Sequence, residues 1–228
     1  MPRAPSPPPL EVLYEDNHCL AVIKPSRLLI AGDETGDPHL LDQAREYLKH
    51  KYDKPGNVFV GLVHRLDRPV SGIVLFARTS KAASRLSEQF RTRTISKRYL
   101  TLVSGRLVQT QGTCRSWLVK DEKTNLVKIV PSKTPEAREA ILHWNTLEQA
   151  PLNTLLRIDL ETGRSHQIRV QLAELGFPIC GDVKYGSPIR CGGAIALHAS
   201  ELTFRHPTTK EEIRLESPPP AWWNAHRR

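Results

Sequence analysis

The sequence predicts an α+β fold in which a mixed, mainly antiparallel sheet is flanked by a few helices. Short runs rich in β-branched residues and bounded by Gly or Pro occur throughout the 228 residues, whereas helical spacing of apolar residues occurs only in a few segments. Several neighbouring runs are joined by short polar turns, which is typical of antiparallel hairpins. We expect the Pro-rich residues 1–9 to form a flexible tail and residues 10–228 to form one domain.

The N-terminal half begins with two short strands around the turn Glu15–Asn17. Asp37 is expected to cap a helix that has Pro38 at its first position and apolar residues at helical spacing as far as Tyr52. A second helix is expected to begin at Ser80. The predicted strands of this half are residues 10–14, 19–23, 58–63 and 73–77.

The C-terminal half reads mainly as strands. A helix is expected after the turn Thr162–Ser165, and Gly176 should end it. Trp222 and Trp223 are expected to pack a short C-terminal segment onto the domain. The predicted strands are residues 99–104, 116–120, 126–130, 140–147, 154–160, 197–204 and 211–215.

The stretch from residue 58 to residue 77 has a charged, kinked centre between two apolar runs. Asp67 lies in that centre between Arg65 and Arg68. Burying a carboxylate is costly unless its charge is paired. Asp67 is therefore either half of a structural ion pair or a chemically active group, and the stretch alone does not decide between them.

The composition limits the class of protein. The net charge of +9 and the pI near 9.6 favour a polyanionic partner such as nucleic acid, although a soluble basic protein without such a partner also fits. No apolar run approaches the roughly 20 residues that span a membrane, and the N-terminus lacks the apolar part of a secretory signal. The four cysteines form no CxxC pair and no zinc-finger spacing, so we expect reduced thiols.

A second polar cluster occupies residues 161–186, around the start of the last predicted helix. It contains Arg164, His166 and Arg169. Such arginines are often only a solvated helix face, but a helix N-terminus also offers N–H groups suited to phosphate. The planar guanidinium of Arg169 would also suit a half-buried carboxylate such as Asp67.

Together these motifs resemble the RluA-type RNA pseudouridine synthases. HRLDRPVSG (residues 64–72) is similar to that family's His-Arg-Leu-Asp signature, and TGRSHQIRVQLAELGFPICGDVKYG (residues 162–186) is similar to its second long motif. Val70 and Gln171 depart from the pattern, where Thr and His are common. Shorter matches follow in the family's order along nearly the whole chain: Glu15-Asp16, Lys24-Pro25, Lys97-Arg98-Tyr99 and Leu197-His198-Ala199.

The resemblance implies a catalytic fold with a cleft across the sheet, and isomerisation of specific uridines in structured RNA, either rRNA or tRNA, to pseudouridine. Breaking the N1–C1′ bond builds positive charge on the sugar, which a carboxylate stabilises or captures. Asp67 would be the nucleophile or base, held ionised and oriented by Arg169. Tyr99 would stack on the uracil and help remove the C5 proton, although a tyrosine in a sheet is also commonly structural.

The resemblance also suggests which residues bind the substrate. The target base must leave its stack, and Arg65 is expected to fill the gap that it leaves. His64 is expected to act as a structural or hydrogen-bonding residue rather than as a proton carrier, and Arg91 and Arg93 are further basic candidates. The residues expected at the substrate, the basic ones mainly through its phosphates, are Lys24, His64, Arg65, Lys97, Arg98, Arg164, Ile168 and Lys184.

Two other classes of protein remain open at this point. One is a catalytically silent RNA-binding or ribosome-assembly protein on the same fold. The other is a glycosidic hydrolase using Asp67, which would need a second carboxylate that neither motif supplies. We expect RNA as the partner, no cofactor, no metal ion, no membrane, no separate N-terminal RNA-binding domain, and a monomer in the cytoplasm.

Overall fold

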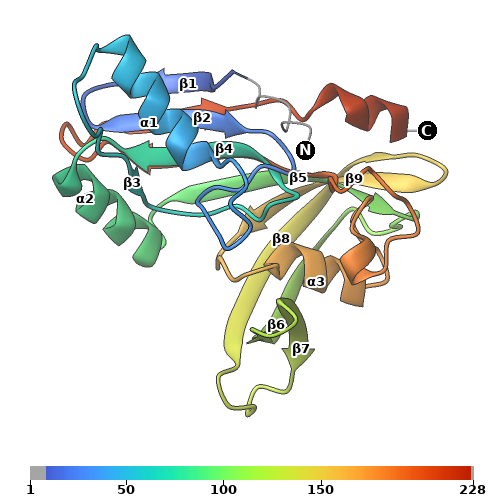
Figure 1. Cartoon of the computed structure of the whole chain (residues 1–228). Coiled ribbons are helices and arrows are strands. Elements are labelled where there is room, and N and C mark those ends of the chain that lie inside the picture. The colour runs from blue at the N-terminus through green and yellow to red at the C-terminus, as the bar shows by residue number, and fades with distance from the viewer. Residues whose placement is uncertain (1–8, 227–228) are drawn as a thin grey trace.

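The computed structural model describes residues 9–226, in which the strands form one eleven-stranded sheet (Figure 1). The helices are α1 (Leu40–Lys51), α2 (Ser80–Arg91), α3 (Gln167–Glu174) and the short 3₁₀ turns η1 (Val183–Tyr185) and η2 (Ala221–His226). The strands are β1 (Glu11–Glu15), β2 (Cys19–Lys24), β3 (Gly61–Leu62), β4 (Ser71–Ala77), β5 (Ser96–Ser104), β6 (Gln111–Asp121), β7 (Leu126–Val130), β8 (Arg138–Gln149), β9 (Asn153–Leu160), β10 (Leu197–Arg205) and β11 (Glu212–Glu216).

The strand order along the sheet is β1-β2-β4-β10-β5-β9-β8-β6-β7, with β11 beside β10 and β3 beside β4. The pairing of β4 with β10 is parallel, and the other pairings between these strands are antiparallel. The predicted mixed, mainly antiparallel α+β fold is therefore confirmed. β10, which comes late in the chain, lies between β4 and β5.

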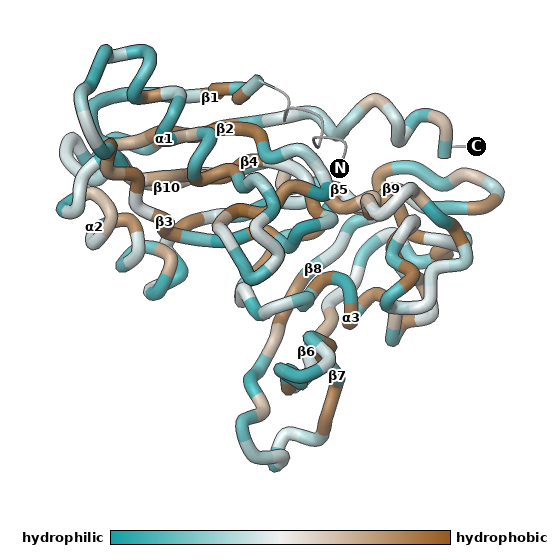
Figure 2. The backbone as a smooth tube through the Cα atoms, in the orientation of Figure 1, coloured by the Kyte–Doolittle hydropathy of each residue, from teal (hydrophilic) through white to brown (hydrophobic). Residues whose placement is uncertain are grey.

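Two helices cover opposite faces of the sheet around β2 and β4 (Figure 1). Successive side chains of a strand point to opposite faces, so Leu20 and Val22 pack in one apolar cluster with α1. Cys19 and Ala21 pack in a second cluster with α2. Figure 2 shows the apolar residues concentrated along these central strands.

Strands β5 and β6 begin three and five residues earlier than predicted, and two further differences concern α1 and β3. His39, not Asp37, caps α1: its backbone is extended, and its side chain accepts from the N–H of Asp42. The predicted strand 58–63 shrinks to the two residues of β3. β2 pairs along one edge of β4, and β10 takes the start of the other edge, so only the end of β4 is left for β3.

The C-terminal segment packs onto the sheet as predicted. Trp223 in η2 is 1% exposed and belongs to the main core, with Trp222 packed beside it. The predicted flexible tail falls almost wholly in residues 1–8, outside the described residues. Between residues 9 and 226, no helix combines the length and the apolar character that crossing a membrane would require.

Candidate active site

Asp67 lies on the loop between β3 and β4, and buried neighbours fix its position. Leu66 and Val70 are 8% and 2% exposed, so the loop is anchored in the core on both sides of the carboxylate. The side chain of Asp67 is 30% exposed. The carbonyl of Asp67 accepts from the N–H of Val70 at 3.0 Å, and that of Arg68 from the N–H of Arg27 at 2.7 Å. The carboxylate is therefore presented from a braced loop.

Gly72 lets β4 approach β10 directly after this loop. Its φ is +122°, and a Cβ there would lie 2.4 Å from the backbone N and O of Ala199. Any larger residue would push the two strands apart. The glycine thus fixes how the Asp67 loop sits against β10.

His198 on β10 holds the same junction through a buried hydrogen bond. Its Nδ1 lies 2.9 Å from Oγ of Ser71, and its Nε2 lies 3.3 Å from Oγ of Ser217. Burial lowers the pKa of His198 to about 4, although a hydrogen bond with Ser217 acts in the opposite direction. The folded protein therefore holds this imidazole neutral.

This lowered pKa makes the stability depend on pH. An unfolded histidine titrates near pH 6.5, so between about pH 6.5 and 4 the unfolded chain binds a proton that folded His198 does not bind. Stability should fall as the pH falls through this window, by about 1.4 kcal/mol per pH unit for this residue. We expect His198→Gln to remove that share of the slope in urea unfolding at a series of pH values.

The matched control is His50→Gln, because the side chain of His50 is 82% exposed. It should leave the pH slope unchanged. Identical slopes in the wild type and His198→Gln would contradict a neutral, buried His198.

Arg169 on α3 is the arginine that pairs with Asp67. Its Nη1 donates to Oδ2 of Asp67 at 3.1 Å, whereas Arg68 pairs with Asp37 at 2.6 Å. The other edge of its guanidinium binds Asp182, with Nε to Oδ2 at 2.7 Å and Nη2 to Oδ1 at 2.9 Å. This two-bond pairing fixes the plane of the guanidinium and hence the position of Nη1 against Asp67.

Asp182 was not among the predicted site residues. It is 1% exposed and follows Gly181, whose φ is +90° and where a Cβ would lie 2.4 Å from the carbonyl oxygen of Ala194. Burial alone would lower the pKa of Arg169, but its bonds and charge attraction to Asp182 and Asp67 outweigh burial and raise that pKa. Asp67, Arg169 and Asp182 thus form one linked ionic group.

His166 and Tyr185 were also missing from the predicted site. His166 is the N-cap residue of α3, and its Nε2 lies 3.6 Å from Oδ2 of Asp67. Tyr185 places its hydroxyl 2.8 Å from Nδ1 of His166, and its ring faces the guanidinium of Arg169 at 5.0 Å. Both residues lie within the second long motif, which is the one sequence signal that could have pointed to them.

Tyr99 on β5 belongs to the same site. It is 9% exposed, and both burial and the charge of Asp67 raise the pKa of its hydroxyl. A neutral phenol beside a carboxylate presents an aromatic face and a polar tip. The structure thus brings together Asp67, Tyr99 and Arg169, the three predicted catalytic side chains.

The predicted phosphate contact of Lys24 is wrong. Lys24 is fully buried, and its Nζ donates to the carbonyls of Pro25, Leu28 and Arg68 at 2.8–3.1 Å. Burial lowers its pKa to about 7, and the nearby charge of Asp67 only partly offsets this effect. Lys24 therefore braces the Asp67 loop from beneath and offers no surface to a phosphate.

The hydrogen-bonding, structural role expected for His64 is confirmed, whereas its predicted substrate contact is not supported. Nε2 of His64 accepts from the N–H of Leu75 at 2.9 Å, its ring stacks on Phe90, and burial lowers its pKa to about 3. His64 is therefore a neutral, structural residue. Arg98 binds Asp159 at 2.8 Å and Glu201 at 2.6 Å, so its charge is compensated within the protein.

The remaining predicted contacts differ in exposure. Ile168 is 5% exposed and packs in the core. Arg65 is exposed on the Asp67 loop. Lys184 is exposed but donates to the carbonyls of Thr124 and Asn125 at 3.3 and 2.7 Å.

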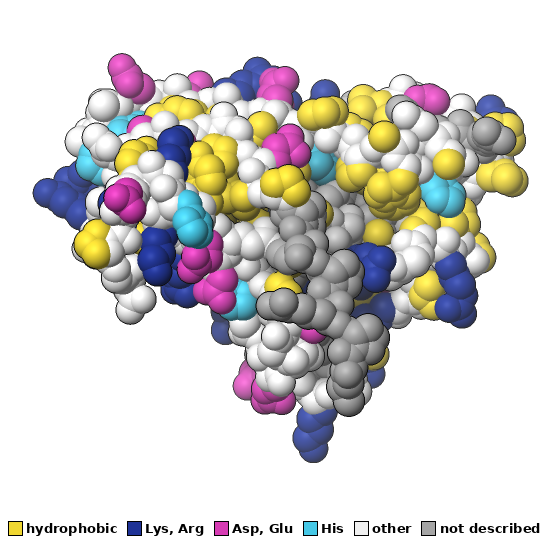
Figure 3. Space-filling view, turned by 45° about the horizontal axis from the view of Figure 1, so that its top comes forward, with side chains coloured by type: hydrophobic (Ala, Val, Ile, Leu, Met, Phe, Trp, Pro, Cys, Tyr) yellow, Lys and Arg dark blue, Asp and Glu magenta, His cyan; other side chains and the backbone are white. Residues whose placement is uncertain are grey.

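A concentration of positive charge adjoins the site. Burial is the main cause that lowers the pKa values of Lys97 and Arg164. The positive charge of Arg93 lowers both values further, and Arg138 adds to this effect at Arg164. We call Arg93, Lys97, Arg138 and Arg164 the basic cluster. Figure 3 shows further Lys and Arg side chains on one face of the molecule, with Asp and Glu side chains among them.

One group of described residues has donor atoms close enough to share a metal ion: Asp16, Cys19 and His206, within 4.8 Å of one another. Nδ1 of His206 accepts from the N–H groups of Thr208 and Thr209 at 3.3 and 2.9 Å. A neutral imidazole that accepts at Nδ1 carries its proton on Nε2, here 2.8 Å from Asp16. Nε2 then has no lone pair for a metal, so the group joins two turns by a polar contact between an imidazole N–H and a carboxylate.

Three comparisons relate this chain to known proteins. A family model described as RNA pseudouridylate synthase matches residues 18–174. The chain is 36% identical to the dual-specificity RNA pseudouridine synthase RluA of Pasteurella multocida, over 94% of this chain and 95% of that protein. It is 35% identical to the ribosomal large subunit pseudouridine synthase D of Xanthomonas campestris, over 95% of this chain and 68% of that protein.

The solved structures agree on the fold. Human RNA pseudouridylate synthase domain containing 4 superposes with a TM-score of 0.79 at 22% identity, covering 95% of this chain and 92% of that one. Human RNA pseudouridylate synthase domain containing 1 gives a TM-score of 0.75 at 24% identity, covering 92% and 84%.

Proposed function

This chain belongs to the RNA pseudouridylate synthase family, and from that membership we propose that it isomerises uridine in ribosomal RNA, with Asp67 as the nucleophile or base. The family makes the protein an isomerase that acts on RNA. The ribosomal substrate is supported by the relative named as a large-subunit enzyme.

The observation that carries the proposal is the ionic group around Asp67. Its carboxylate is partly open to solvent, whereas the side chains of Arg169 and Asp182 are 5% and 1% exposed. Rupture of the N1–C1′ bond leaves positive charge on the sugar, which the open carboxylate could stabilise or capture. The buried pair of Arg169 and Asp182 keeps that carboxylate oriented, and the opposite charges of the pair neutralise each other.

Tyr99 completes this account of the chemistry. Its buried ring offers the detached uracil a face for stacking while C5 turns toward the sugar. Its raised pKa keeps the hydroxyl protonated, so the hydroxyl acts as a hydrogen-bond donor. We propose that it orients the base by donating a hydrogen bond, and that the C5 proton passes to water after C5 has bonded to C1′.

The basic cluster supplies a path for the RNA backbone. The charge of Arg93 acts on both Lys97 and Arg164, and Nζ of Lys97 reaches the turn before Arg164, since a Cβ on Gly163 would lie 2.8 Å from it. Cations brought this close repel one another, and phosphates that bind between them relieve the repulsion. We therefore propose Arg93, Lys97, Arg138 and Arg164 as phosphate contacts, and Lys184 as a further one.

Arg65 is proposed to fill the gap that the flipped uridine leaves in the RNA stack. Arg65→Ala should lower turnover on a folded stem-loop by about tenfold, because the cost of unstacking is then not offset. On a substrate whose target uridine is already unstacked, the loss should be about twofold or less. Single-turnover rates on the two substrates provide the measurement.

Arg45→Ala is the control for this charge removal, because Arg45 lies on α1 and pairs with Asp42. It should affect neither substrate. Equal losses on both substrates in Arg65→Ala would count against the gap-filling role.

The experiment that tests the function is pseudouridine mapping of total RNA from cells with and without the gene, joined to tritium release from C5-labelled rRNA by the purified protein. We expect at least one rRNA pseudouridine to disappear with the gene, and the purified protein to release tritium. Binding to the RNA without tritium release would favour a catalytically silent RNA-binding protein. Free uracil among the products would indicate glycosidic hydrolysis instead.

A further inference from the structure

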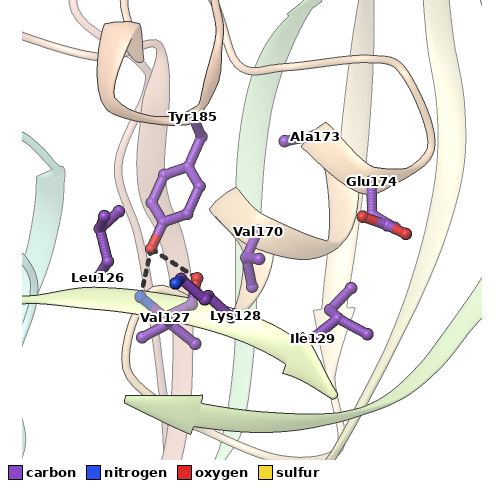
Figure 4. A pocket seen from close by; sticks show the side chains of 8 residues that line it. All are labelled: Leu126, Val127, Lys128, Ile129, Val170, Ala173, Glu174 and Tyr185. Carbon is purple, nitrogen blue, oxygen red and sulfur yellow. Dashed lines mark hydrogen bonds between the residues drawn. The ribbon is translucent and has the colours of Figure 1, made fainter. Parts of the chain in front are cut away.

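A row of close polar contacts joins the β6–β7 hairpin to the reactive carboxylate. The N–H of Val127 on β7 donates to the hydroxyl of Tyr185 at 3.0 Å, as Figure 4 shows. That hydroxyl lies 2.8 Å from Nδ1 of His166, and Nε2 of the same ring lies 3.6 Å from Oδ2 of Asp67. The row thus runs from the backbone of an edge strand to the site of chemistry.

The direction of the row follows from counting protons. The hydroxyl of Tyr185 has one proton to donate, and its acceptors are Nδ1 of His166 at 2.8 Å and the carbonyl of Val127 at 3.4 Å. The shorter bond to His166 is the stronger one. Nδ1 is then an acceptor, so a neutral imidazole carries its proton on Nε2, the nitrogen nearest Asp67.

Neutral imidazole is the form that the surroundings favour. Burial lowers the pKa of His166, Arg169 and Lys184 lower it further, and Asp67 and Asp182 only partly oppose these effects. His166 also has a left-handed backbone, with φ of +51°, and its side chain makes no capping bond to α3. His166 therefore occupies the N-cap position, but its side chain does not cap α3 and is free to contact Tyr185 and Asp67.

Two residues of the turn η1 bind the β6–β7 hairpin by hydrogen bonds. Lys184 holds the carbonyls of Thr124 and Asn125, and Tyr185 holds Val127. Beside them β7, α3 and Tyr185 line an open groove of about 450 Å³ (Figure 4). Val127 also packs with Val170 of α3 in a small buried apolar cluster, so the hydroxyl of Tyr185 adds a specific polar contact between the hairpin and the centre to this apolar packing.

We propose that Tyr185 and His166 are positioning residues that transmit the seating of the β6–β7 hairpin to Asp67. While Val127 holds the hydroxyl of Tyr185, the imidazole keeps its N–H on the side of the carboxylate. The inference rests on the proposed function, since Asp67 is the reacting group there. It adds that a change in the position of the hairpin would change the hydrogen bonding of His166 and hence the surroundings of Asp67.

The first test is the state of the His166 ring in the full-length protein. Long-range ¹H–¹⁵N spectra show which ring nitrogen carries the proton, and the signals of His166 are those absent from His166→Gln. We expect a protonated Nε2 in the wild type and loss of this preference in Tyr185→Phe. A protonated Nδ1 in the wild type, or an unchanged ring in Tyr185→Phe, would overturn the proposal. This measurement needs no turnover, so its outcome is separate from that of the proposed function.

The second test separates positioning from folding by kinetics on an RNA stem-loop. Tyr185→Phe should lower kcat by about three- to tenfold, the value of one hydrogen bond, with KM changed by less than about twofold. His166→Gln can offer an amide N–H in place of Nε2, so its kcat should exceed that of His166→Ala by about fivefold or more. Tyr47→Phe removes a hydroxyl that donates to Glu15 at 2.8 Å and should leave both constants unchanged. Equal kcat values for the two His166 variants, or a loss in KM alone, would overturn the proposal.

Discussion

Asp67→Asn should abolish pseudouridine formation, with a loss of at least about 10⁴-fold in single-turnover rate, while RNA affinity stays within about threefold. The amide keeps the size of the side chain and can still contact Arg169, but it lacks the charge and the nucleophilic oxygen. The binding is expected to persist because it depends on phosphate contacts made elsewhere. Tritium release and a filter-binding titration on the same RNA measure the two effects.

Asp42→Asn is the matched control, since Asp42 is an exposed residue of α1. It should retain the wild-type rate. Pseudouridine formed by Asp67→Asn, after mass spectrometry has excluded deamidation, would show that another residue carries the chemistry.

Arg169→Ala should cost about 3–5 kcal/mol of stability as well as activity, because it leaves the fully buried charge of Asp182 unpaired. Asp182→Ala should be similarly destabilising, since the guanidinium then has only the half-exposed Asp67 as a partner. Urea unfolding of each variant, with circular dichroism as the probe, gives the free energies. Activity should be lost in both variants, because the orientation of Asp67 depends on the pair.

The double variant Arg169→Ala/Asp182→Ala should be less unstable than the sum of the single variants, by about 2 kcal/mol, because one interaction is counted in both. The exposed pair Arg45 and Asp42 provides the comparison, for which the same cycle should give less than about 1 kcal/mol. Strict additivity at Arg169 and Asp182 would mean that the two charges are stabilised independently.

The sequence pattern was informative where a structure is decided locally. The hairpin of β10 and β11 follows from two alternating apolar runs and a polar turn, and the turn itself sets the pairing. The contact between Asp67 and Arg169 could also be predicted, because a half-buried carboxylate requires a cation and Arg is suited to supply it. The catalytic role of Asp67 remains a prediction.

The rest of the site depends on how distant segments come together. Asp182 and Tyr185 become partners of α3 only because the chain turns back at Gly181, and no local periodicity encodes that return. Lys24 illustrates the converse error. A lysine before a proline at the end of a strand is usually solvent-exposed, and only the assembled loop carbonyls make its burial tolerable.

The place of β10 between β4 and β5 has a consequence for how the chain is made. Until residues near 200 have left the ribosome, β4 and β5 each lack a neighbour along one edge, and open edges pair readily with other chains. The emerging N-terminal segments would thus wait for a strand made more than a hundred residues later, and the loop that carries Asp67 would be braced against β10 only then. The loop that carries Asp67 would therefore take up its final position only after β10 has been made.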